Sequence, residues 1–146
     1  MAIGIPAAQL AALRKGMAAK PRKPIDTAAV DLLAFHVKAQ RLPTPDREYR
    51  FAAMAVGGTG AGVKERLRKA RLRDWRFDFA WPDQMVALEM DGGGFVGGRH
   101  GTGPGIEKDC EKYSNAAAMG WRLLRVTPRQ VKSGQAVDWI GKALEI

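Results

Sequence analysis

Apolar residues alternate with polar or small ones in two neighbouring segments near the middle of the chain. In 75-WRFDFAWP-82, Phe77, Phe79 and Trp81 occupy every second position, and 86-VALEMD-91 repeats the pattern with its own apolar residues. This spacing is typical of strands, in which successive side chains point to opposite faces. The segments are close enough in sequence to form a hairpin, and we expect their aligned apolar residues to share one core.

The spacing of apolar residues elsewhere predicts helices on both sides of these strands. In chain order, the expected elements are a helix over 25–40, strands over 47–53, 75–82 and 86–91, a helix over 106–119, a strand over 121–127, and a helix, turn and helix over 128–146. In the helix over 106–119, Ile106, Cys110 and Tyr113 recur at helical spacing, which predicts that they face the core. The order α-β-β-β-α-β-α indicates an α/β domain with a mixed central β-sheet flanked by helices.

Composition divides the chain into an arm and a domain. Residues 1–25 are basic and end at 21-PRKP-24, where proline interrupts helical structure. Residues 26–146 are expected to form a single domain, with an insertion rich in glycine and basic residues at about 54–73.

The glycine run 57-GGTGAG-62 invites comparison with a phosphate-binding loop. The spacing does not fit, because Val63 precedes Lys64 and Glu65 stands where Ser or Thr would hold the metal. We therefore expect a flexible insertion here rather than a nucleotide site.

Length and cysteine content narrow the class of protein. A chain of 146 residues suits one domain with a real core. No apolar stretch approaches the roughly 18 residues that cross a bilayer, and the N-terminus lacks the continuous apolar core of a secretory signal. The one cysteine, Cys110, excludes an internal disulfide and a multi-cysteine zinc site. We expect a protein of the reducing cytoplasm with no membrane partner.

Charge points to a polyanionic partner. The formal net charge is +9 and the isoelectric point is near 10.1, and basic residues concentrate in the arm and in 64-KERLRKARLRDWR-76. Such clusters neutralise phosphates, so DNA is the expected partner, although a basic protein can also be merely soluble. The residues expected to hold DNA are Lys64, Arg66, Arg68, Lys69, Arg71, Arg73, Arg76 and Arg99, together with Phe95, whose ring lies among glycines and could wedge against a base.

Three acids fall between the apolar positions of the expected hairpin. If the apolar faces share one core, Asp78, Glu89 and Asp91 project together on the other face. Crowded carboxylates repel one another unless a positive group lies between them, and Mg²⁺ or Mn²⁺ takes such oxygen ligands. The alternative is that each acid pairs with a nearby arginine on a solvated face.

The order of FDF-AWP, VALEMDGG, KDCEKY and GWRLLRVT resembles the PD-(D/E)XK nuclease superfamily. Within it, the chain is similar to small single-domain nucleases related to very-short-patch repair endonucleases and to phage endonucleases of this type. It is more distantly similar to archaeal-type Holliday-junction resolvases. The resemblance spans roughly 26–130, and 75–127 carries nearly all of it. It implies a restriction-endonuclease-like core and Mg²⁺-dependent hydrolysis of DNA.

Matched by position, Asp78 corresponds to the superfamily's metal-binding aspartate and Glu89 to the acid of the next strand. Where the pattern has lysine two residues beyond that acid, this chain has Asp91. The missing positive charge could come from the following helix, through Lys112 or alternatively Lys108.

Two further residues, Glu48 and His100, are candidates for catalytic roles in the same pattern. Many superfamily members carry a glutamate on the first helix, and Glu48, on the strand after that helix, is the nearest acidic substitute here, ahead of Glu65. His100 could protonate the leaving oxygen or orient the attacking water, because histidine titrates near neutrality. It could equally be an exposed loop residue that touches phosphate.

The resemblance therefore implies a metal-dependent DNA endonuclease of a phage or prophage, acting in the host cytoplasm. Asp78, Glu89 and Asp91 would hold Mg²⁺ or Mn²⁺, with Lys112, His100 and Glu48 assisting catalysis. The substrate could be branched or Holliday-junction DNA in phage DNA processing, recombination or repair, for which a symmetric homodimer would suit. Two alternatives stay open: a catalytically inactive nucleic-acid-binding module of the same fold, and an interaction protein for an acidic partner.

Overall fold

A hairpin of two apolar strands forms the middle of the sheet. The computed structural model describes residues 26–92 and 103–145 of the chain. In it, β2 (Phe77–Trp81) and β3 (Val86–Met90) pair antiparallel around a short 3₁₀ turn, η1 (Pro82–Gln84). Proline suits the first position of that turn because its φ is fixed and it has no N–H to satisfy. The expected hairpin is therefore confirmed.

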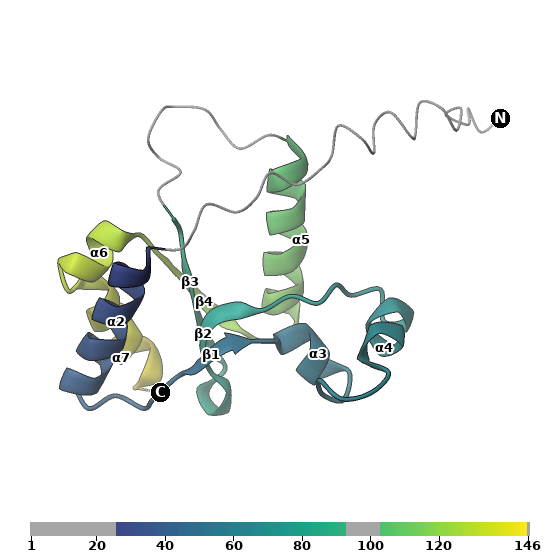
Figure 1. The fold of residues 1–146 in the computed structure, drawn as a ribbon, viewed down its shortest axis with the longest axis horizontal. Helices are drawn as coiled ribbons and strands as arrows, with labels where there is room; N and C mark the ends of the chain where they lie inside the picture. The colour runs from purple at the N-terminus through teal and green to yellow at the C-terminus, as the bar shows by residue number, and fades with distance from the viewer. Residues whose placement is uncertain (1–25, 93–102, 146) are drawn as a thin grey trace.

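The outer strands complete a four-stranded mixed sheet in the order β1-β2-β3-β4 (Figure 1). β1 (Asp46–Tyr49) is antiparallel to β2, and β4 (Arg122–Val126) is parallel to β3. A parallel pair needs a long crossover, which α5 (Gly103–Ala118) supplies. The expected α/β class and mixed sheet are confirmed.

Helices cover both faces of this sheet (Figure 1). One face packs against α2 (Thr27–Ala39), α6 (Pro128–Lys132) and α7 (Gln135–Leu144), and the other against α3 (Phe51–Ala55), α4 (Val63–Lys69) and α5. Every residue of β3 is buried as a result. The polar face expected for the hairpin is therefore not a solvated surface but a second interior.

The strand expected over 47–53 is too long. β1 ends at Tyr49, and Phe51 begins the helix α3. The Phe51 ring lies parallel to the Phe77 ring, with centroids 4.1 Å apart and planes at 8°. Both rings are buried in the second core, so tertiary packing overrides the strand-like alternation of this short segment.

The expected alternation of Phe77 with Phe79 and Trp81 is also wrong. Phe79 and Trp81 lie in the core under α2, whereas Phe77 lies in the other core, beside Trp121. The regular pairing of β2 with β3 begins only at Phe79, because the side chain of Asp78 accepts the backbone N–H of Met90. At this point a side-chain carboxylate, not a backbone carbonyl, accepts the N–H of the partner strand. Phe77, the residue before Asp78, faces the other core.

The expected buried face of α5 is wrong by about one position. Cys110 is exposed and Ile106 is 49% exposed, while Lys112 and Ala116 face the sheet. Sequence spacing favours apolar residues for an inward face, but here that face carries a lysine because a buried acid on β3 needs a cation. Ala116 keeps the helix close enough for the contact.

The segment 54–73 contains α4 and a loop held by one arginine. The guanidinium of Arg66 donates hydrogen bonds to the backbone oxygens of Val56, Gly58 and Ala61, at 2.6 to 2.9 Å. Leu67, the next residue, is buried in the core shared with α3 and α5. The Arg66 side chain therefore holds the loop that precedes α4 through hydrogen bonds to its backbone oxygens.

Across residues 26–92 and 103–145, none of the helices has the length and apolarity needed to cross a bilayer.

The role of Arg66 gives a stability prediction. Arg66→Ala leaves three carbonyls without their charged donor, and we expect a loss of about 2 kcal/mol in the free energy of unfolding. Arg68→Ala, on the same helix, breaks only an exposed pair with Glu65 and should cost less than about 0.5 kcal/mol. Urea unfolding of both variants measures the difference, and equal stabilities would contradict this role.

Candidate active site

Each of the four strands carries one charged residue near the same line across the sheet. Glu48 lies between Arg47 and Tyr49, which pair with Phe79 and Phe77, so it lies across from Asp78. Asp78 itself lies just beyond the regular β2–β3 pairs and contacts the backbone next to Glu89. Glu89 in turn pairs with Arg125 on β4. We call these four residues the charged row. Three acids and one base on adjacent strands are thus brought together by the sheet itself, from segments far apart in sequence.

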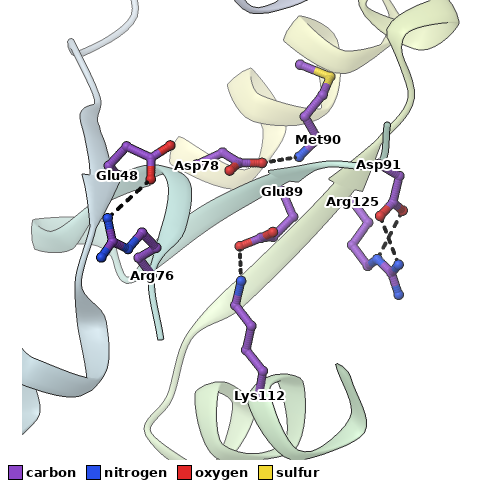
Figure 2. A network of polar contacts seen from close by, with 8 residues as sticks. All are labelled: Glu48, Arg76, Asp78, Glu89, Met90, Asp91, Lys112 and Arg125. Atoms are coloured by element: carbon purple, nitrogen blue, oxygen red, sulfur yellow. Dashed lines mark hydrogen bonds and ion pairs between the residues drawn. The ribbon is translucent and has the colours of Figure 1, made fainter. Parts of the chain in front are cut away.

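Glu89 is the most deeply buried acid of the row, at 8% exposure, and it contacts Lys112, at 5% exposure. The Lys112 ammonium extends from α5 toward the sheet and donates a hydrogen bond to Glu89 Oε1 (Figure 2). Burial of either charge alone would be costly, so each requires the other. The sequence-based expectation that Lys112 brings a positive charge from the following helix agrees with this contact.

Asp78 lies beside Glu89 through a backbone contact. Its Oδ2 accepts the N–H of Met90 at 2.7 Å, and that N–H belongs to the peptide bond that follows Glu89 (Figure 2). A carboxylate that accepts a backbone N–H is held in one orientation by a charge-assisted hydrogen bond. The two acids at matching positions of the expected motif are therefore neighbours in the fold.

Asp91 has a different partner. Both of its carboxylate oxygens accept hydrogen bonds from Arg125, at 3.1 Å from Nε and 2.9 Å from Nη2. The Arg125 guanidinium also lies over the ring of Tyr113, 4.7 Å from its centroid. Burial raises the pKa of Tyr113 to about 12, and the negative charge of Glu89 adds to the effect.

Glu48 is held in an uncommon backbone conformation. Its φ is +49°, in the left-handed region that non-glycine residues seldom adopt. Its carboxylate lies 3.7 Å from Arg76, and both side chains are about half exposed. Of the two acids considered for this position, Glu48 lies on the strand next to Asp78, whereas Glu65 pairs with Arg68 on α4.

The carboxylates of the charged row do not form a three-acid metal site. Within the described ranges, no group of three His, Cys, Asp or Glu side chains is arranged to hold a metal ion. Mg²⁺ commonly takes only one or two carboxylates and completes its shell with water and substrate phosphate. Asp78 and Glu89 are the two acids that lie next to each other along the hairpin, while Glu89 contacts Lys112 and both oxygens of Asp91 contact Arg125.

The other residues expected at the site are dispersed. Lys108 is exposed on α5, and Arg73 pairs with Glu111 at 3.2 Å. Lys64, Lys69 and Arg71 are exposed on and just after α4. The remaining expectations, for Phe95, Arg99, His100 and the arm over 1–25, lie outside the described residues.

Arg125 and Tyr113 are site residues that sequence reasoning missed. Arg125 lies in the strand 121-WRLLRVT-127, and parallel pairing of this strand with β3 would have set it beside the acids. Tyr113 was expected to face the core, and it instead lies half-buried against Arg125 and Lys112.

A separate small pocket lies on the other side of the molecule, between α2 and α7. It has a volume of about 210 Å³ and is lined by His36, Ala39, Gln40, Gly134, Val137 and Asp138. It shares no residue with the charged row.

Comparison with known proteins assigns no family to this arrangement. No protein-family model matches the chain, and no curated protein or solved structure matches it. The fold class and the contacts of the charged row rest on the structure, and the nuclease resemblance stays an expectation carried by residues 75–127.

The buried pair yields a prediction for α5. Lys112→Met removes the buried ammonium that donates to Glu89, and we expect the free energy of unfolding to fall by about 3 kcal/mol. Lys108→Met removes an exposed lysine one turn away and should change it by less than about 0.5 kcal/mol. The double variant Glu89→Gln/Lys112→Met should regain part of the loss, because the buried negative charge is removed together with the ammonium. Chemical unfolding of the four proteins tests this, and a Lys112→Met variant as stable as Lys108→Met would refute it.

Tyr113 yields a prediction at alkaline pH. Its pKa is about 12 in the folded protein and near 10 when unfolded. The folded state therefore retains the proton over that interval, and the stability contributed by the protonated phenol is lost as the pH rises from about 10 to about 12. Urea unfolding across this interval should show a steeper fall for the wild type than for Tyr113→Phe. Parallel curves would show that the phenol of Tyr113 ionises normally.

Proposed function

We propose that this protein is a metal-dependent nuclease that hydrolyses phosphodiester bonds of DNA. The observation that carries the proposal is the buried Glu89–Lys112 pair next to Asp78. The Glu89 carboxylate and the Lys112 ammonium are buried, where their electrostatic effect on a reacting phosphate is largest, and the half-buried Asp78 is bonded to the backbone next to Glu89. The proposal rests on the second acid, Asp78, standing next to this buried pair at the position that matches the nuclease motif.

The proposed roles follow from these contacts. Asp78 and Glu89 would hold Mg²⁺ or Mn²⁺, which when bound supplies an activated water and neutralises charge on the phosphate. Lys112 would keep its ammonium beside Glu89 and stabilise negative charge that develops on the phosphate oxygens. Glu48, with its strained backbone and its position opposite Asp78, would orient groups from the β1 side.

The position of Lys112 supports the resemblance to the PD-(D/E)XK superfamily. In that pattern the lysine lies two residues beyond the acid, on the same strand, where this chain has Asp91. Here Lys112, on the helix that covers this face of the sheet, contacts the corresponding acid, Glu89. We therefore infer that Lys112 replaces the motif lysine in a restriction-endonuclease-like core.

DNA is the substrate that the charge of the chain favours. The net charge is +9, and Lys64, Lys69 and Arg71 lie exposed on and after α4, where they could contact phosphates without regard to sequence. Branched DNA as the preferred substrate, a homodimer, and a phage-encoded enzyme of the host cytoplasm belong to the same proposal and rest on the resemblance alone.

One observation favours a second candidate function. Each acid at the site contacts a positive group or a backbone N–H of the protein itself, so the site is electrostatically complete without a cation. A nucleic-acid-binding module of the same fold, without catalysis, would have such a site.

Incubation of supercoiled plasmid and of four-way-junction DNA with Mg²⁺, Mn²⁺ or EDTA separates the two candidates. We expect cleavage with either metal, none with EDTA, and a loss of about 100-fold or more in rate for Asp78→Asn. Asp83→Asn is the matched control, because Asp83 is an exposed acid at the other end of the hairpin. Absence of metal-dependent cleavage by the wild type, or equal rates for the two variants, would exclude the enzyme and favour the binding module.

A further inference from the structure

Arg125 combines three features of an anion-binding residue. Its guanidinium is fixed by Asp91, which accepts hydrogen bonds from Nε and Nη2, and by the ring of Tyr113 beneath it. Its side chain is nonetheless 47% exposed. In the part of the chain that the structure describes, its third nitrogen, Nη1, donates to no acceptor. Oriented donors therefore remain available at the surface.

The position of Arg125 relates these donors to the proposed active site. Arg125 is the direct neighbour of Glu89 in the parallel β3–β4 register, and both side chains lie on the α5 face of the sheet. Figure 2 shows the Asp91–Arg125 pair and the Glu89–Lys112 pair side by side along β3. A phosphate chain that reaches Glu89 would thus pass within reach of Arg125.

From this geometry we propose that Arg125 binds a backbone phosphate of DNA, and that Asp91 is a positioning residue that holds Arg125 for this contact. The inference rests on the proposed function for the identity of the ligand. Arginine suits the task because its planar donors match phosphate oxygens in pairs. Asp91 then acts through Arg125 instead of binding the metal, which explains why an acid occupies the position where the nuclease pattern has lysine.

The test is DNA binding in EDTA, measured by fluorescence anisotropy with a labelled duplex over a range of salt concentrations. No cleavage and no metal is required. We expect Arg125→Ala to weaken binding about tenfold at low salt and to reduce the salt slope by about 1. The control is Arg41→Ala, which removes an equal charge from an exposed arginine just after α2, at the end of that helix away from the last residues of β3 (Figure 1). Arg125→Lys keeps the charge but not the planar donors, so it should retain the slope and lose affinity even if Arg125→Ala folds poorly.

Asp91→Asn separates positioning from simple charge. Removal of an acid should by charge alone strengthen binding to a polyanion, whereas loss of the group that orients Arg125 should weaken it. We expect weaker binding, and no additional loss when Asp91→Asn is combined with Arg125→Ala.

The outcomes that overturn the proposal are distinct from failure of the proposed function. If the wild type binds DNA but Arg125→Ala behaves like Arg41→Ala, the role of Arg125 is wrong while the nuclease proposal stands. If Asp91→Asn binds as tightly as the wild type or more tightly, the positioning role is wrong. If the wild type binds no DNA at any salt concentration, the proposed substrate and this inference both fail.

Discussion

The buried contact between Glu89 on β3 and Lys112 on α5 constrains the rest of the structure. A carboxylate in the interior of a sheet is destabilising unless a cation reaches it, and here the helix that covers the same face supplies one. The pair therefore fixes the side of α5 that faces the sheet and the distance at which α5 packs. Ala116, one turn further on, is small enough to allow that approach.

The neighbouring contacts follow from the placement of α5. Once Lys112 points inward, Tyr113 comes to lie between Lys112 and Arg125, and Arg125 extends to Asp91 at the end of β3. On the other side of Glu89, the carboxylate of Asp78 accepts the Met90 N–H and ends the regular hairpin ladder. The alternative of acids paired on a solvated face is thus only half correct. Pairing occurs, but the central pair is buried, and burial is the condition under which such groups affect a reacting phosphate most strongly.

The strands and helices could be predicted from the sequence wherever one apolar face decided the structure. The hairpin, the strand at 121–127 and the closing helices have clear periodicity, and the mixed sheet follows from their order. The sequence-based predictions were wrong where a polar contact between distant segments decided the structure. Periodicity assigned Cys110 to the core and could not show that Glu89 requires Lys112 there. It also could not show that Asp78 would interrupt the alternation at Phe77. Asp78 and Glu89 could be selected from their spacing, but Arg125 could not, because its relation to them depends on strand register.

A crystal structure with Mn²⁺ bound tests the central claim most directly, since anomalous scattering locates the ion without assumptions about the reaction. The account predicts an anomalous peak between the carboxylates of Asp78 and Glu89, with Lys112 still in contact with Glu89 and Asp91 still paired with Arg125. A peak found only elsewhere, for example beside His36 and Asp138, or no peak at Mn²⁺ concentrations that support cleavage, would contradict it.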